Sequence, residues 1–297
     1  MILSRRRYEV RALVLTLILG MSTPGAAVAS ELQRLIKEAH AAVEGSDFGR
    51  AENLYRQALV QAKLGKEPRI IQAAVSLLAW TYLQEHKYAD AEALCRDALH
   101  SFKKDRVSRQ YQGRILYILG VCLLADEDKP RKSAVNVIKR AASIYELEDY
   151  PAPLNEALEP LDTLARINWD SGRFGEAERL MKAKITAQQK QGSPDDIALA
   201  VDLRQLARIY TRQSKLIEAS IKFREALEIY ERQEQSSGEP YMRCLAEYAN
   251  VLLDIEDSSE LNRVKELLVA LKAFRDVPTT QLDDKIRNYA LQDRSWR

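Results

Sequence analysis

Residues 206–227 read LARIYTRQSKLIEASIKFREAL and hold two apolar stripes on either side of a polar stretch. Before the polar stretch, apolar and small residues lie three or four positions apart, at Leu203, Leu206, Ala207 and Tyr210. After it, the same spacing joins Ala219, Phe223, Ala226 and Leu227. This spacing is typical of one face of an α-helix. The segment therefore predicts two helices joined by a turn over residues 211–215.

The same pattern recurs along the chain with a nearly constant period. Each predicted first helix has a small residue, with 40 to 45 residues between successive copies, at Ala39, Ala79, Gly120, Ala165, Ala207 and Ala249. A second marker follows 12 to 14 residues later, at Ala51, Ala91, Ala134, Ala177, Ala219 and, in the sixth copy, Leu261. Two sets of positions that keep one period indicate six internal repeats.

Small residues at fixed positions have a packing reason. Helices that approach to about 8–10 Å leave no room for a large side chain where they cross, and Ala permits the approach while favouring helix. One hairpin cannot bury its own apolar face, but stacked hairpins share a continuous core. Helix-forming residues dominate the 297-residue chain, which has only 11 Gly and 9 Pro. We therefore predict an all-α fold.

Residues 206–210 (LARIY) and 218–227 (EASIKFREAL) resemble tetratricopeptide repeats, and the period near 42 is similar to the longer repeats of kinesin light chains. This resemblance implies a right-handed α-solenoid of stacked helix-turn-helix repeats. We assign six hairpins to residues 30–275 and a C-terminal capping helix or tail to residues 276–297. The family pattern consists almost wholly of packing residues, so it predicts the fold far better than the function.

Residues 1–29 resemble a secretory signal peptide. A basic start with Arg5, Arg6, Arg7 and Arg11 precedes the apolar stretch ALVLTLILGM at 12–21, and AVA at 27–29 offers small residues before Ser30. The apolar stretch is well short of the roughly 20 residues that cross a bilayer. We expect cleavage before Ser30 and a periplasmic or secreted protein. An uncleaved N-terminal membrane anchor is the alternative.

The chain contains no recognisable catalytic or cofactor-binding motif. Nucleophile-elbow, zinc-protease, phosphate-loop and dinucleotide-binding patterns are absent from the sequence. Cys95, Cys122 and Cys244 fall on apolar helix positions and are not at metal-ligand spacing. The net charge of +2 gives no global field for nucleic acid. We expect no catalytic residue, cofactor, metal or nucleic-acid partner, and buried thiols.

The resemblance implies that successive first helices line a concave groove that binds peptides. In the fifth copy, Arg204, Arg208 and Arg212 follow one helical stripe at i, i+4 and i+8. Arg166 and Asn250 match Arg208 one repeat earlier and one repeat later, and Arg243 lies near the start of the sixth first helix. The predicted groove residues are therefore Arg166, Arg204, Arg208, Arg212, Arg243 and Asn250. Guanidinium groups in such a groove suit an acidic peptide. The alternative is an ordinary solvated stripe paired with nearby Asp and Glu.

These patterns favour an exported scaffold or adaptor that binds a protein or peptide partner. Two other interpretations stay open. The first is a self-assembling structural element of the envelope. The second is an accessory or sensing subunit of an enzyme or secretion complex. Membrane contact is expected only through an uncleaved N-terminal segment.

Overall fold

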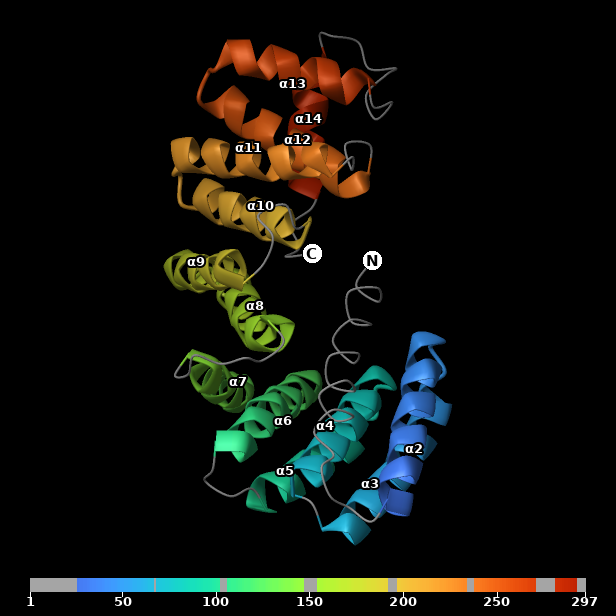
Figure 1. The fold of residues 1–297 in the computed structure, drawn as a ribbon. Coiled ribbons are helices and arrows are strands. Elements are labelled where there is room, and N and C mark those ends of the chain that lie inside the picture. Colours follow the sequence, from blue (N-terminus) through green and yellow to red (C-terminus); the bar gives the residue numbers. More distant parts are fainter. Residues whose placement is uncertain are drawn as a thin grey trace. The chain divides into compact units, whose positions relative to one another are not determined.

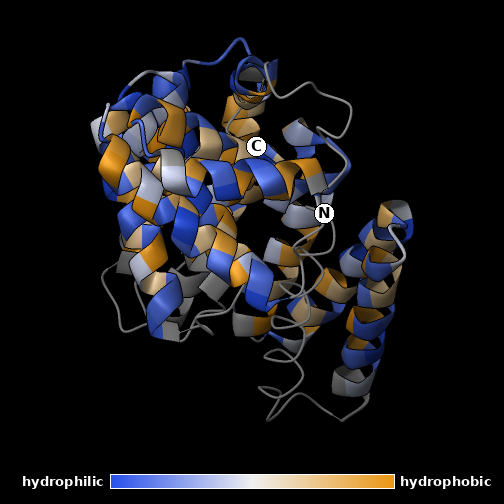
Figure 2. Ribbon diagram, turned by 90° about the horizontal axis from the view of Figure 1, so that it is seen from above, coloured by the Kyte–Doolittle hydropathy of each residue, from blue (hydrophilic) through white to orange (hydrophobic). Residues whose placement is uncertain are grey.

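The computed structural model describes residues 26–66, 68–101, 106–146, 154–191, 197–233, 238–270 and 281–292. Throughout these ranges the regular structure is helical, without a β-strand, which confirms the all-α prediction. The helical ribbons in Figure 2 carry a mixture of hydrophilic and hydrophobic residues. Residues 1–25, which hold the basic start and the apolar stretch of the predicted signal peptide, lie outside the described residues.

Six hairpins follow one another along the chain (Figure 1). Their first helices are α2 (Ala26–Glu44), α4 (Pro68–Gln84), α6 (Arg106–Ala125), α8 (Leu154–Asp170), α10 (Ile197–Arg212) and α12 (Glu239–Asp254). Their second helices are α3 (Phe48–Gly65), α5 (Tyr88–Ser101), α7 (Arg131–Glu146), α9 (Phe174–Gln191), α11 (Leu216–Arg232) and α13 (Ser258–Ala270). A further helix, α14 (Leu282–Gln292), comes last among the described residues.

Five of these hairpins share one turn geometry. A residue with φ between 58° and 70° follows the first helix, at Ser46, His86, Gly172, Ser214 and Glu256. The next residue donates its N–H to the carbonyl five positions earlier, as Lys215 does to Tyr210 (2.9 Å). This Schellman arrangement satisfies carbonyls at the helix end. Because only one of the five residues is Gly, helix packing must hold the other four in a conformation that costs a non-Gly residue about 1–2 kcal/mol.

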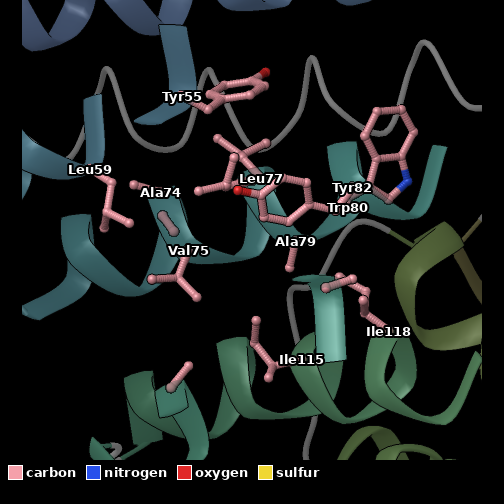
Figure 3. Close-up of a cluster of buried hydrophobic side chains, with 14 of the residues drawn as sticks. Tyr55, Leu59, Ala74, Val75, Leu77, Ala79, Trp80, Tyr82, Ile115 and Ile118 are labelled. Atoms are coloured by element: carbon pink, nitrogen blue, oxygen red, sulfur yellow. The ribbon is translucent and has the colours of Figure 1, made fainter. Parts of the chain in front are cut away.

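The chain divides into two compact units, Met1–Pro160 and Leu161–Arg297. In the first unit, α4 packs against α3, α5 and α6. Figure 3 shows Tyr55 and Leu59 of α3 on one side of α4, with Ile115 and Ile118 of α6 on the other. The marker residues lie at the crossings: all ten marker alanines of the chain have no exposed surface, and Gly120 is buried.

In the second unit, α10 packs against α9, α11 and α12, and α12 also contacts α11, α13 and α14. In the part of α14 whose side chains the structure describes, Leu282 and Ile286 are buried. Two ion pairs hold this helix to its neighbours, Arg287 to Asp254 (2.8 Å) and Lys265 to Asp283. The helix therefore covers part of α12 beyond the sixth hairpin.

A recurrent ion pair joins neighbouring repeats. In three repeats, the residue after the second marker is a glutamate that accepts a hydrogen bond from a lysine in the next repeat's turn. These pairs are Glu52–Lys87 (2.5 Å), Glu92–Lys129 (2.5 Å) and Glu178–Lys215 (2.8 Å). A basic residue four positions along the same helix binds each glutamate too, at Arg56, Arg96 and Lys182. Each glutamate thus bridges its own helix and the following hairpin.

Candidate functional site: the first-helix face of the second unit

The six predicted groove residues all lie in the second unit, on first helices. Arg166 is on α8, three lie on α10, and Arg243 and Asn250 are on α12. The structure separates them by exposure. Arg204 and Arg208 are only 4% and 7% exposed, whereas Arg166 and Arg212 are exposed and Asn250 and Arg243 are half-buried. The stripe is therefore part interior and part surface.

Arg204 forms a buried, two-point ion pair with Glu247 of α12. Its Nε donates to Oε2 at 2.6 Å and its Nη2 to Oε1 at 2.9 Å. Two parallel N–H···O bonds to one carboxylate fix both distance and orientation. The pair therefore specifies how α12 packs on α10, in addition to neutralising both charges.

Arg208, one turn further along α10, binds the same carboxylate. Its Nε lies 3.4 Å from Glu247 Oε1, and its Nη1 donates to Gln205 Oε1 at 2.9 Å. Its guanidinium carbon lies 5.2 Å from the ring centroid of Trp169, a cation–π distance. Arg208 therefore links α8, α10 and α12.

A second buried ionic group lies between α8, α9 and α10. Lys184 Nζ donates to Asp162 Oδ1 at 2.6 Å and to Asp202 Oδ1 at 2.8 Å. Burial acts to lower the pKa of the Lys184 ammonium, but the carboxylates of Asp202 and Asp162 outweigh burial and raise that pKa. Lys184 therefore stays charged and holds the two aspartates together.

These contacts revise the expected electrostatics of the stripe. The two buried groups contain three cations, Arg204, Arg208 and Lys184, and three carboxylates, from Asp162, Asp202 and Glu247. As the alternative interpretation expected, Arg204 and Arg208 are paired with a nearby carboxylate, but they are buried instead of solvated. Arg204 and Arg208 thus contribute much less free positive charge than their spacing in the sequence suggested.

Sequence reasoning missed Glu247, although the repeat offered a signal. Glu247 lies 43 positions after Arg204 and 39 after Arg208, which is the register of a neighbour in the next first helix. One repeat earlier, Gln205 stands 39 positions after Arg166. Gln205 has an amide where Glu247 has a carboxylate, so it cannot form the equivalent ion pair, and Arg166 is exposed.

Arg212 and Arg166 form the exposed part of the stripe, next to aromatic rings. The Arg212 guanidinium lies 5.8 Å from the ring centroid of Trp169 and 5.2 Å from that of Phe174. The two rings meet edge to face, 5.4 Å apart. Arg166 is three positions before Trp169 on α8, so the two are neighbours on the helix surface. We call Arg166, Trp169, Phe174 and Arg212 the arginine–tryptophan ledge.

The half-buried positions behave differently. Arg243 binds Glu239, four residues earlier on α12, with Nη2 2.6 Å from Oε1. The partly exposed guanidinium of Arg243 is therefore bound to a carboxylate of its own helix. Asn250, on the same helix, is an uncharged half-buried side chain.

The described ranges show no cluster of His, Cys, Asp or Glu suited to a metal ion. Burial raises the pKa of the Cys122 thiol to about 12, and burial raises the pKa values of Cys95 and Cys244 as well. Such thiols are poor nucleophiles at neutral pH.

Within the same ranges, every helix is too short or too polar to cross a lipid bilayer.

Comparison with known proteins agrees with the repeat pattern. Residues 156–232 match the family model of the tetratricopeptide repeat. No curated protein matches the chain.

Several solved structures have a similar fold, and three of them serve as examples. A protein described as a kinesin light chain with nearly identical repeats, from Podospora anserina, shares 17% identity over 71% of this chain and 99% of its own, with a TM-score of 0.52. BtubC (BKLC) from P. vanneervenii shares 16% over 83% and 93%, with a TM-score of 0.54. RapI without ligand shares 12% over 98% and 87%, with a TM-score of 0.63. The predicted resemblance to the longer, kinesin-light-chain type of repeat is confirmed.

Proposed function

We propose that this tetratricopeptide-repeat chain is an exported interaction scaffold that binds an acidic segment of a protein partner on the first-helix face of its second unit. Repeats of this family are typically non-enzymatic interaction modules, and the family match lies at residues 156–232. The observation that carries the proposal is the arginine–tryptophan ledge within that region. Its two arginines are exposed on first helices, the side that the family uses for binding.

The chemistry of the ledge favours a carboxylate-bearing partner. Among the described residues, Arg212 contacts the faces of two rings but no carboxylate, so its N–H groups can bind a ligand. Arg208 is already bound to Glu247 and lies against Trp169, so it serves to fix that ring. A partner carboxylate at Arg212 and Arg166 would make charge-assisted hydrogen bonds, the stronger class. An adjacent apolar side chain would cover the indole.

The test compares capture of partners from an envelope extract by two variants. Arg166→Glu combined with Arg212→Glu reverses the charge of the ledge without touching the buried pairs. Arg179→Glu on second helix α9 is the matched control, because Arg179 is an exposed arginine outside the first-helix face. We expect the ledge variant to lose captured proteins and the control to retain them. Equal capture by both variants would exclude the ledge as the binding site.

Export is the second part of the proposal. Cleavage before Ser30 would remove only the first four residues of α2, Ala26–Ala29, and would leave its buried Leu32, Leu35 and Ile36 in place. The folded hairpin is therefore compatible with this cleavage. Expression of residues 1–297 in a bacterial host, followed by intact-mass measurement of the periplasmic fraction, should show a chain beginning at Ser30. A full-length mass in the membrane fraction would instead support the anchor alternative.

A further inference from the structure

Large apolar side chains are exposed at four positions of the described residues. Their exposed fractions are 57% for Val60, 66% for Leu64, 60% for Ile217 and 39% for Ile221. They form two pairs with i, i+4 spacing, one on α3 of the first unit and one on α11 of the second. Single exposed apolar residues are ordinary. Two adjacent ones on a helix make a small apolar stripe.

The stripe on α11 leads to a hollow. Ile217, Ile221, Arg224 and Glu228 follow one another at steps of four, three and four, so they share one face of the helix. Arg224 and Glu228 line a hollow of about 90 Å³ between α11, α12 and α13. Its apolar wall is made by Leu227, Leu245, Tyr248, Val264 and Leu267.

The size and charge of this hollow indicate what kind of group it can bind. Sites for small molecules or cofactors measure about 300–1,000 Å³, so this one holds about one side chain. Its rim has three carboxylates, of Glu228, Glu231 and Glu260, against two guanidinium groups, of Arg224 and Arg263. An apolar side chain flanked by positive charge fits both properties.

The apolar pair on α3 has that chemistry. Lys63 lies between Val60 and Leu64 in sequence, Lys66 follows the helix, and both lysines are exposed. Residues 53–66 contain no Asp or Glu. The α3 face is therefore apolar and basic, whereas the α11–α13 face is apolar with an acidic excess.

We propose that this protein associates with itself head to tail, the α3 face of one copy docking on the α11–α13 face of another. The two faces differ, so the contact is heterologous and leaves each copy with one unused face for further growth or ring closure. The residues of the α11–α13 face are all different from those of the arginine–tryptophan ledge. Two aliphatic side chains from each copy make an interface below the roughly 1,200 Å² of stable complexes, so association is weak and transient.

Sedimentation velocity over a concentration series tests the proposal. The mean mass of the wild-type protein should rise with concentration. Val60→Gln with Leu64→Gln, or Ile217→Gln with Ile221→Gln, should raise the dissociation constant by about tenfold or more, equivalent to about 1.4 kcal/mol. All four positions are exposed and Gln favours helix, so unchanged circular dichroism confirms that each variant is folded. Asn53→Gln with Glu218→Gln, at exposed polar positions of the same helices, is the matched control and should associate like wild type.

Mixing the two apolar-to-Gln variants gives the decisive result. Each variant keeps one intact face, so an equimolar mixture should form heterodimers and stop there. A mixture that stays monomeric, a wild-type mass independent of concentration, or Gln variants that associate like wild type would each overturn the proposal. Partner capture by the monomeric variants remains a separate readout, so failure of self-association does not imply failure of the ledge.

Discussion

At the residue scale, Gly120 shows why small residues mark the helix crossings. A Cβ at this position would lie 2.3 Å from Cγ1 of Ile138 on α7, and Cγ1 is too near the backbone to move freely. We expect Gly120→Ala to lower the free energy of unfolding by about 1–2 kcal/mol. Overpacking costs about 1–3 kcal/mol, and the better helix propensity of Ala returns at most about 1 kcal/mol. Urea unfolding followed by circular dichroism measures the difference.

Gly175→Ala is the control for this substitution. Gly175 lies in α9, and a Cβ there would meet nothing within 4 Å. The variant should be as stable as wild type or more stable, by up to about 1 kcal/mol. If both glycine variants lost stability equally, close approach of α6 and α7 would not be the reason for Gly120.

Glu247 allows a second prediction at this scale. Glu247→Gln removes the charge that neutralises Arg204 and Arg208 inside the protein. Breaking a buried ion pair from one side costs about 3–5 kcal/mol, because the remaining charge stays buried. We expect a loss of that order in the free energy of unfolding, measured by urea denaturation.

Glu239→Gln provides the comparison on the same helix. Glu239 pairs with Arg243 at the surface of α12, and exposed pairs contribute little. Its substitution should leave the unfolding midpoint nearly unchanged. A similarly small effect of Glu247→Gln would mean that water reaches the buried pair and that it does not organise the helix packing.

At the element scale, the glutamate–lysine pairs join one hairpin to the next, and Glu178 offers a pH test. Burial acts to raise the pKa of Glu178, but hydrogen bonds from Lys182, Lys215 and Gln213 outweigh it and lower the pKa to about 2 from its ordinary 4.5. The stability that ionised Glu178 contributes is therefore fully present above about pH 4.5 and is lost as the pH falls towards 2.

Glu178→Gln should reduce stability at pH 7 by about 1 kcal/mol, since it removes charge-assisted bonds at a partly solvated site. It should also make the unfolding midpoint less dependent on pH between 4.5 and 2. Thermal unfolding at several pH values measures both effects. Glu176→Gln, at an exposed pair with Arg179, should change neither. An unaltered acid limb in Glu178→Gln would show that this bridge does not join the repeats energetically.

The elements themselves were largely predictable from the sequence. Positions such as Ala79 and Ala207 reflect close helix packing, which leaves no room for a large side chain at a crossing. Their period therefore located the hairpins, and both residues are fully buried. The turns were also marked by polar stretches, although the left-handed Ser214 and Glu256 have no glycine signal.

The candidate site was less predictable. Helical spacing placed Arg204, Arg208 and Arg212 on one stripe, but it predicted all three equally as exposed groove residues. Their actual environments depend on the next first helix. Glu247 of that helix forms buried ion pairs with Arg204 and Arg208, whereas Arg212 is exposed. Pair interactions between neighbouring helices need the crossing geometry as well as the register, and no single-helix pattern contains it.

At the scale of the whole molecule, the division into two compact units predicts which part of the chain a destabilising substitution affects. Gly120 lies in the first unit, and Glu247 lies in the second. In repeat proteins each repeat contacts mainly its neighbours, so stability is roughly a sum of local and nearest-neighbour contributions. A destabilised repeat should therefore open its own unit before the other.

Hydrogen exchange measured by mass spectrometry tests this expectation. Gly120→Ala should speed exchange in α4, α6 and α7 and leave α10 and α12 near wild-type rates, while Glu247→Gln should do the reverse. The reason is that amides exchange through the least costly opening that exposes them, and that opening is local in a stacked array. Equal acceleration in both units by either variant would mean that the chain unfolds as one cooperative body. In that case the division at Pro160 would describe the geometry of the contacts but not their energetics.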